Sequence, residues 1–473
     1  MNELTLRLRD GSVLVLPPSL NSITTYAVLE QDDWFEKEVG FFAAYLRPGM
    51  NVLDIGANLG VYAIPMARRV GPSGHVFAYE PGSAARALFE RSRAENALGN
   101  LSISAAAISD SAREGRLHIG TSSELNRLSD EGGGETVQLV TLDGEDSAQN
   151  WPRIDVVKMD AEGEELRILN GAKQFLKHHA PLIMFEMRQG GNVALDLISA
   201  FRASGFGIYR TLVGAPLLVP VTVDETLDAG ELNLFAATSE RARTMAEEGF
   251  LVETQAPYSP PTNAREVAMA EFRAHAFSSV FASIREPDAD YAEALAAISQ
   301  WYDSSREWPA RYAALLFAVR RLQQICVRTP SLPRLSSLMR AGWELGAREI
   351  IVAAGMQFPE ALRWPQNIAE PFLIATKRFE DTKPTGNPMN WFVTAGLEQL
   401  ERNASYSSYF GATGLDLNWL AKQEFVATEI ERRRVLIALR AGRRMTVPDL
   451  LTRPSYDHIN ADIWRQRLVP GLS

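Results

Sequence analysis

The stretch Asn51-Val-Leu-Asp-Ile-Gly-Ala-Asn-Leu-Gly60 is the strongest indication of the fold in the first half of this chain. Its apolar start is typical of a buried strand, and its two glycines predict a tight turn that opens a helix. From residue 51 to about 188, strand-like runs alternate with helical patterns, which we place at 59–69, 83–98, 162–177 and 193–204. This alternation predicts an α/β fold with a doubly wound parallel sheet.

Acidic residues recur where the predicted strands end. Together with the first strand, the runs at 76–80, 101–110, 155–160 and 181–186 supply a row of carboxylates, namely Asp54, Glu80, Asp110, Asp160 and Glu186. Ligands of open parallel sheets bind outside the carboxyl ends of the strands, so these acids should share the binding edge. Such a row favours a ligand rich in hydroxyls, amines or positive charge, and it disfavours a polyphosphate.

The glycine spacing differs from that of a dinucleotide-binding turn. Gly56 and Gly60 form Gly-x-x-x-Gly, whereas the dinucleotide motif is Gly-x-Gly-x-x-Gly and seats a pyrophosphate on a helix N-terminus. We expect these glycines to let the backbone approach a ligand closely, and a purely structural tight turn is the alternative. Asp54 would repel a pyrophosphate, but it suits an ammonium group or hydroxyls.

An acid at the end of the next strand predicts a ribose site. Glu80 follows Gly56 at close to the offset of about 20 residues at which an acid contacts ribose hydroxyls in such folds. Ala107 and Ile108 belong to the third strand-like run, where an adenine would lie. These features describe an adenosine pocket without a phosphate cradle, and S-adenosylmethionine fits that description.

Several motifs together resemble the FkbM family of S-adenosylmethionine-dependent methyltransferases. They include Asp54-Ile-Gly-Ala-Asn-Leu-Gly60, Tyr79-Glu-Pro81, Thr141-Leu-Asp143, Ile154-Asp-Val-Val-Lys-Met-Asp-Ala-Glu-Gly163 and Pro181-Leu-Ile-Met-Phe-Glu186. The resemblance covers about residues 10–240. It implies a seven-stranded class I methyltransferase sheet and O-methylation of a hydroxyl on a sugar, glycan or natural product. Ala63 and Met159-Asp-Ala depart conservatively from the commoner family residues.

The strand positions and the resemblance together assign the candidate cofactor-binding residues. These are Asp54, Gly56, Ala57, Asn58, Gly60, Glu80, Pro81, Ala107, Ile108 and Asp160. Trp34 and Glu38 resemble the acidic and aromatic segment at the start of the family domain. We expect Glu38 to approach the amino-acid tail of the cofactor, and an exposed helix acid is the alternative.

Three carboxylates are candidate general bases for methyl transfer: Asp160, Glu162 and Glu186. A hydroxyl that attacks the methyl carbon must lose its proton, and Asp160 or Glu162 is favoured because both follow the strand that faces the methyl group. As alternatives, Asp160 only binds the cofactor, and Glu162 only complements a helix dipole. The three acids also suit a divalent cation, although we expect no metal. We interpret His178 and His179 as partners of a helix C-terminus.

Composition limits the partners and the compartment. The net charge is −10, with −12 over residues 1–250 and +2 over 251–473, and the acidic first half disfavours nucleic acid. Cys326 is the single cysteine, which fits a reducing compartment. The chain starts without a signal-peptide pattern, and no apolar run approaches the ~20 residues that span a bilayer. We predict a cytoplasmic protein without a transmembrane segment.

The rest of the chain predicts two further units. We expect a methyltransferase domain at 1–250, a proline-containing linker at 251–262, and a separate all-α domain at 263–473, which is a bundle or a repeat-like stack. The helical domain would select a small-molecule or glycan acceptor or form a homodimer. Basic clusters at 432–434 and 440–444 predict a solvated face, and a dock for an anionic acceptor or an acidic partner is the alternative.

Smaller elements and rival functions complete the prediction. Residues 3–16 predict a hairpin, 34–46 a helix, and 111–150 either a β-arm or a plain loop. A nicotinamide-dependent oxidoreductase is one rival, which the missing third glycine disfavours. A catalytically weak scaffold whose helices bind a partner is another, and the retained acidic row argues against it.

Overall fold

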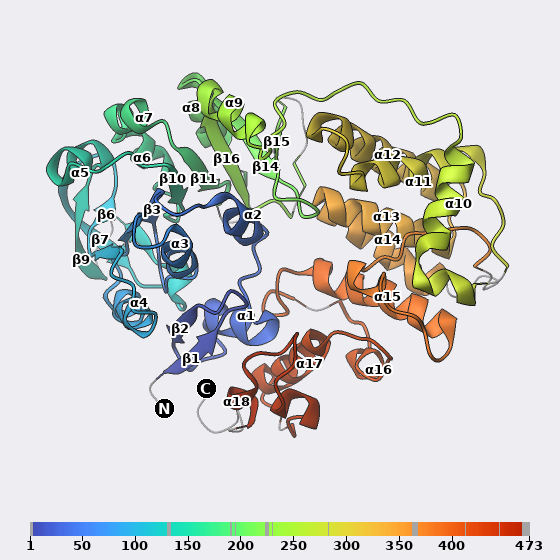
Figure 1. The fold of residues 1–473 in the computed structure, drawn as a ribbon. Coiled ribbons are helices and arrows are strands. Elements are labelled where there is room, and N and C mark those ends of the chain that lie inside the picture. The colour runs from blue at the N-terminus through green and yellow to red at the C-terminus, as the bar shows by residue number, and fades with distance from the viewer. Residues whose placement is uncertain are drawn as a thin grey trace.

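The computed structural model describes residues 3–129, 134–189, 192–193, 195–222, 227–228, 230–281, 283–361, 368–411, 413–443 and 445–465. An eight-stranded sheet organises the first half, with the strand order β15-β14-β16-β11-β10-β3-β4-β5 (Figure 1). Five of these strands pair in parallel: β3 (Asn51–Ile55), β4 (His75–Tyr79), β5 (Leu101–Ser104), β10 (Val156–Met159) and β11 (Leu182–Glu186). The predicted doubly wound α/β fold is therefore present.

Three strands close the sheet with antiparallel pairing. These are β14 (Phe206–Thr211), β15 (Leu218–Pro220) and β16 (Asn233–Thr238). The predicted count of seven strands is one too low, because β15 adds to β14 at the edge of the sheet.

Helices cover both faces of this sheet because adjacent strand residues point to opposite sides. Val52 joins the core that contains α2 (Glu38–Tyr45), α3 (Ala63–Val70) and α4 (Ser83–Glu95). Its neighbour Leu53 joins the core that contains α6 (Glu165–Asn170), α7 (Lys173–His179) and α8 (Leu195–Ala203). The helix predicted at 162–177 is thus two short helices.

A second, four-stranded sheet lies in the interval that predicted a β-arm or a loop. It contains β6 (Ala107–Ile108), β7 (Arg113–His118), β8 (Arg127–Ser129) and β9 (Glu135–Val140). The β-arm interpretation is therefore the better one. The strand-like run at 101–110 is divided between the two sheets, which leaves Asp110 exposed. Helix α5 (Leu142–Gln149) was not predicted, because only Leu142 is buried and no apolar stripe marks it.

The predicted hairpin at the start of the chain is present as β1 (Leu4–Arg7) and β2 (Val13–Leu16). Helix α1 (Ile23–Gln31) follows, with its first eight residues buried. A helix buried on nearly every side has no amphipathic stripe, so its sequence pattern did not predict it.

Helices dominate the second half. After α9 (Ser239–Glu247) come α10 (Ala264–Ala274), α11 (Ala289–Tyr302), α12 (Trp308–Arg328), α13 (Leu332–Leu345), α14 (Arg348–Ala361), α15 (Pro388–Ala404), α16 (Leu417–Leu420), α17 (Thr428–Arg440) and α18 (Ala461–Arg465). Consecutive helices from α10 to α15 pack against one another. Their core also includes Leu212, Leu217 and Val219 from the edge of the sheet. Within the described ranges, no helix is long and apolar enough to cross a membrane.

The end of the chain returns to its beginning (Figure 1). Val435 and Trp464 share a core with the N-terminal hairpin. Asn460 Nδ2 donates to the Arg7 carbonyl oxygen over 2.9 Å, and Asn460 Oδ1 accepts from the Arg7 N–H over 2.8 Å. The helical region therefore packs on the first domain from two sides, and its boundaries at 251 and 263 stay a prediction.

Buried ion pairs hold α17 against α1. Arg432 lies 2.9 Å from Asp32, and Arg433 lies 3.3 Å from Glu30 and 3.0 Å from Glu429. The prediction that the cluster at 432–434 forms a solvated face is wrong for these two arginines, because long-range carboxylates neutralise them in the interior. The cluster at 440–444 extends to Arg444, which lies outside the described residues.

Candidate active site

A cavity of about 620 Å³ opens at the carboxyl ends of the parallel strands. Its walls come from the turn after β3, the ends of β4, β10 and β11, the small sheet, and the segment before α2. Most predicted site residues line it: Gly56, Ala57, Asn58, Glu80, Pro81, Ala107, Ile108, Asp160, Glu162 and Glu186. Three do not, namely Glu38, Asp54 and Gly60.

The glycine turn is shaped by packing more than by ligand approach. Gly56 has φ +74°, and a Cβ there would lie 1.8 Å from the backbone oxygen of Asp160. Gly60 has φ +83°, and a Cβ there would lie 2.4 Å from the ring of Phe89. Both positions therefore require glycine because other parts of the chain pack closely against them. Gly60 does not line the cavity, and its contact with the ligand stays a prediction.

Glu80 is held in the wall of the cavity by two backbone donors. Its Oε2 accepts from the Asn58 N–H over 2.8 Å, and its Oε1 accepts from the Gly82 N–H over 2.7 Å. Burial raises the pKa of the Glu80 carboxyl to about 7, although both hydrogen bonds oppose that shift. The carboxylate is thus pre-positioned as a hydrogen-bond acceptor for a ligand.

Asn58 offers a second acceptor in the same wall. Its backbone has φ +47°, and its Oδ1 is buried without a hydrogen-bond partner in the described part of the chain. A buried acceptor without a donor costs free energy, which a ligand that supplies the donor would recover. The ammonium or hydroxyl groups of S-adenosylmethionine suit this position.

Lys158 is the central cation of the site, and the sequence analysis missed it. It lies in the apolar strand β10, where a charged residue between Val157 and Met159 was the available signal. Its Nζ donates to the Gly56 carbonyl oxygen over 2.8 Å and lies 3.3 Å from Asp160. It also lies 3.4 Å from Asp54.

Asp54 therefore lies behind the cavity wall. Its side chain is fully buried, and burial raises the pKa of its carboxyl despite the neighbouring ammonium of Lys158. Asp54 does not line this cavity and has Lys158 beside its carboxylate, so its contact with the ligand stays a prediction.

The three candidate bases form one cluster. Oxygens of Asp160, Glu162 and Glu186 lie within 4.8 Å of one another. Burial and the neighbouring carboxylates raise the pKa of Glu162 to about 7 and that of Glu186 to about 10. Three oxygen donors at this separation match the ligands that Mg²⁺ or Ca²⁺ takes, so the cluster is also chemically suited to a divalent cation.

Glu36 is a cavity residue that the sequence analysis passed over in favour of Glu38. Its Oε2 accepts from the Tyr62 hydroxyl over 2.5 Å and from Asn233 Nδ2 over 3.0 Å, and burial raises its pKa to about 6. Glu38 is buried outside this cavity, where burial raises its pKa to about 8. The expected placement of Glu38 is corrected, because the turn into α2 directs Glu36 to the cavity.

The histidine pair lies away from this cavity. His179 is buried, accepts from the Ile154 N–H through Nδ1, and lies 2.9 Å from Asp146 through Nε2. Both ring nitrogens of His179 thus have structural partners at the end of α7.

The strand order is that of a Rossmann-like, doubly wound α/β fold, and the acid-lined cavity lies at the carboxyl ends of its parallel strands. Residues 54–207 match the family model of the methyltransferase FkbM domain. The N-terminal domain is therefore an FkbM methyltransferase domain, which confirms the resemblance seen in its motifs.

Solved structures similar to this chain include two methyltransferases and a fibrillarin. The FkbM methyltransferase from Methylobacillus flagellatus KT is 16% identical with a TM-score of 0.29, and the match covers 41% of this chain and 47% of that chain, about half its length. An S-adenosylmethionine-dependent O-methyltransferase from Thermotoga maritima is 19% identical with a TM-score of 0.29, covering 50% and 77%. Fibrillarin from Aeropyrum pernix, with natively bound S-adenosylmethionine, is 11% identical with a TM-score of 0.26, covering 50% and 82%. The curated proteins contain no match.

Proposed function

We propose that this protein is an S-adenosylmethionine-dependent O-methyltransferase that methylates a hydroxyl of a sugar or glycan. The observation that carries the proposal is the cavity at the sheet edge. It is lined by Glu80, a buried acid at the position expected for a ribose ligand, by apolar side chains, and by a cluster of carboxylates. Glu80 would accept the ribose hydroxyls, and Ala107 and Ile108 would contact the adenine. Asn58 Oδ1 would accept a donor from the amino-acid tail.

Glu162 is the best candidate for the general base. Its pKa of about 7 lies near neutral pH, where a base is both ionised and able to take a proton. It makes no hydrogen bond or ion pair with other described residues, whereas Lys158 neutralises Asp160 at 3.3 Å. Its backbone also has φ +50°, an uncommon conformation for glutamate that is more frequent at functional sites.

The chemistry divides between the cofactor and these side chains. When bound, S-adenosylmethionine supplies an electrophilic methyl group. Glu162 would accept the proton of the acceptor hydroxyl as the oxygen forms its new bond to carbon. Glu186, whose pKa of about 10 keeps it protonated at neutral pH, would donate a hydrogen bond to the acceptor.

Two measurements test this function. Calorimetric titration with S-adenosylhomocysteine should show micromolar binding, and mass spectrometry should detect methyl transfer to members of a sugar panel. The Glu162→Gln variant should retain binding and lose roughly 10²- to 10⁴-fold in transfer rate, the usual contribution of a general base. Glu114→Gln, at an exposed carboxylate on β7, is the matched control.

The outcomes separate the rival functions. Absence of binding by folded protein would reject the cofactor. Binding without transfer to any sugar would favour the scaffold, and equal rates for wild type and Glu162→Gln would remove Glu162 as the base.

A further inference from the structure

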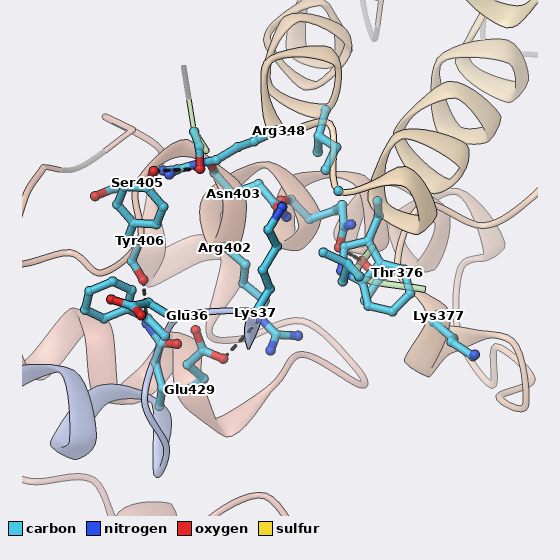
Figure 2. Close-up of a pocket in the computed structure, with 18 of the residues that line it drawn as sticks. Glu36, Lys37, Arg348, Thr376, Lys377, Arg402, Asn403, Ser405, Tyr406 and Glu429 are labelled. Atoms are coloured by element: carbon cyan, nitrogen blue, oxygen red, sulfur yellow. Dashed lines mark hydrogen bonds and ion pairs between the residues drawn. The ribbon is translucent and has the colours of Figure 1, made fainter. Parts of the chain in front are cut away.

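A second cavity of about 520 Å³ adjoins the first (Figure 2). The two cavities share four lining residues, which are Phe35, Glu36, Leu232 and Tyr406. The other walls come from α13, α14, α15 and α17, so the helical half of the chain builds most of this space. Glu36 and Tyr406 therefore lie at the boundary between the two cavities.

Basic side chains predominate in the lining of the second cavity. They are Lys37, Arg348, Lys377, Arg378, Arg402 and Arg433, against the acids Glu36, Glu38 and Glu429. Most of the cations have carboxylate partners: Lys37 lies 2.6 Å from Glu231, and Arg402 lies 3.1 Å from Glu429. Burial raises the pKa of Glu38 to about 8, which removes most of its negative charge near neutral pH, whereas Glu36, whose pKa burial raises to about 6, stays mostly ionised.

Arg348 differs from the other arginines of this lining. In the described part of the chain no carboxylate oxygen lies within 4.0 Å of its guanidinium. Its Nε donates to the backbone oxygen of Asn403, and its Cζ lies 3.9 Å from the ring centre of Tyr406 (Figure 2). Burial lowers the pKa of this guanidinium, although Tyr406 and the charge of Asp228 oppose the shift, and an anion would stabilise this partly buried cation further.

A buried amide adds a donor without a partner to the same cavity. Gln399 is 3% exposed, and its Nε2 has no hydrogen-bond acceptor among the described residues. A buried amide donor without an acceptor costs free energy that a ligand oxygen would recover. Trp343 adds an aromatic face that suits the C–H face of a sugar ring.

We propose that the second cavity is the acceptor site and that the acceptor is a phosphorylated sugar, with its phosphate on Arg348 and its reacting hydroxyl directed past Glu36 to the first cavity. This inference rests on the proposed methyltransferase function. A guanidinium stacked on an aromatic ring presents its donors in the planar fork that matches phosphate oxygens. The acidic edge of the sheet disfavours phosphate in the first cavity. The cofactor would therefore lie in the first cavity and the phosphate of the acceptor in the second.

The test uses the full chain loaded with S-adenosylhomocysteine. Glucose 1-phosphate, inorganic phosphate, glucose and glucuronate are titrated calorimetrically. We expect both phosphate compounds to bind, and glucose and glucuronate to bind at least tenfold more weakly than glucose 1-phosphate. Absence of phosphate binding, or equal binding of glucose or of glucuronate, would overturn the proposal.

Two variants assign the phosphate to Arg348. Arg348→Gln should weaken glucose 1-phosphate binding at least tenfold, and Arg348→Lys, which keeps the charge but not the fork, should weaken it at least threefold. Arg320→Gln, at an exposed arginine on α12, is the matched control and should have no effect. Unchanged affinity in Arg348→Lys and Arg348→Gln would overturn the proposal, and Arg348→Lys alone decides it if the glutamine variant does not fold.

The cofactor titration keeps the two proposals distinguishable. Both Arg348 variants should bind S-adenosylhomocysteine within twofold of wild type, because Arg348 does not line the first cavity. Failure of wild type to bind S-adenosylhomocysteine would reject the methyltransferase function. If the wild type binds S-adenosylhomocysteine but neither glucose 1-phosphate nor inorganic phosphate, the acceptor assignment is rejected and the methyltransferase function is not.

Discussion

Replacement of Glu80 by glutamine removes one charge and one acceptor while it preserves the shape of the side chain. In the wild type, both carboxylate oxygens accept a backbone N–H, from Asn58 over 2.8 Å and from Gly82 over 2.7 Å. In the variant, an amide NH₂ must face one of these donors or rotate toward the ligand. Either arrangement leaves one donor without an acceptor.

The magnitude follows from the bonds that are lost. A hydrogen bond to a charged group contributes about 1.5–3 kcal/mol, and the variant loses at least one such bond to a ribose hydroxyl. The dissociation constant for S-adenosylhomocysteine should therefore rise roughly 10- to 150-fold, since 1.4 kcal/mol corresponds to about tenfold.

The pKa of Glu80 adds a pH dependence with a defined sign. Burial raises the pKa of this carboxyl from 4.5 to about 7, and only the ionised form accepts two hydroxyl donors. Affinity in the wild type should fall roughly tenfold between pH 8 and pH 6, because the ionised fraction falls about tenfold over that range. The glutamine variant should lack this component.

Calorimetric titration at several pH values measures both effects. Glu90→Gln, at an exposed carboxylate on α4, is the control and should match the wild type. A change below twofold in Glu80→Gln, together with the wild-type pH dependence, would contradict the role of Glu80 and move the ribose site elsewhere.

Three further predictions concern stability. Gly56→Ala should lower the free energy of unfolding in urea by more than about 3 kcal/mol, because it combines a positive φ with a Cβ placed 1.8 Å from a backbone oxygen; Gly99→Ala, with open space around it, should cost less than about 1 kcal/mol, and equal losses would contradict the packing argument. Arg433→Met should lower the free energy of unfolding by about 3–5 kcal/mol, because it leaves buried carboxylates without their cation. Arg434→Met removes a half-buried ion pair and should lower it by less than about 1 kcal/mol. A larger loss in Arg434→Met than in Arg433→Met would be inconsistent with this structure. Burial raises the pKa of Glu38 from 4.5 to about 8, so the folded state binds its proton more tightly than the unfolded state. The stability that this proton contributes is fully present below pH 4.5 and is lost as the pH rises through 8. Relative to Glu38→Gln, the free energy of unfolding of the wild type should fall by up to about 1.4 kcal/mol per pH unit in that window, and parallel pH profiles of the two proteins would exclude the shift.

Local patterns in the sequence predicted most of the sheet and much of the first cavity. Apolar runs that end at a glycine turn specify buried parallel strands, and a parallel sheet brings the carboxyl ends of its strands to one edge. For that reason Glu80, Asp160, Glu162 and Glu186 could be expected near one another before any coordinates were known. Elements without an apolar period, such as α1 and α5, left no comparable signal.

The sequence alone was enough to predict the α/β fold of the N-terminal half, its resemblance to the FkbM family, which a family model matches over residues 54–207, and the residues that follow each strand. The packed fold alone shows that Lys158 pairs with both Asp54 and Asp160, that Glu36 rather than Glu38 lines the first cavity, and that a second cavity adjoins it. This difference arises because the interactions act over different separations along the sequence. Strand and turn preferences depend on residues that are neighbours in the chain. Buried charged side chains pair with residues from distant segments, and these pairs form only when the helices pack against the sheet.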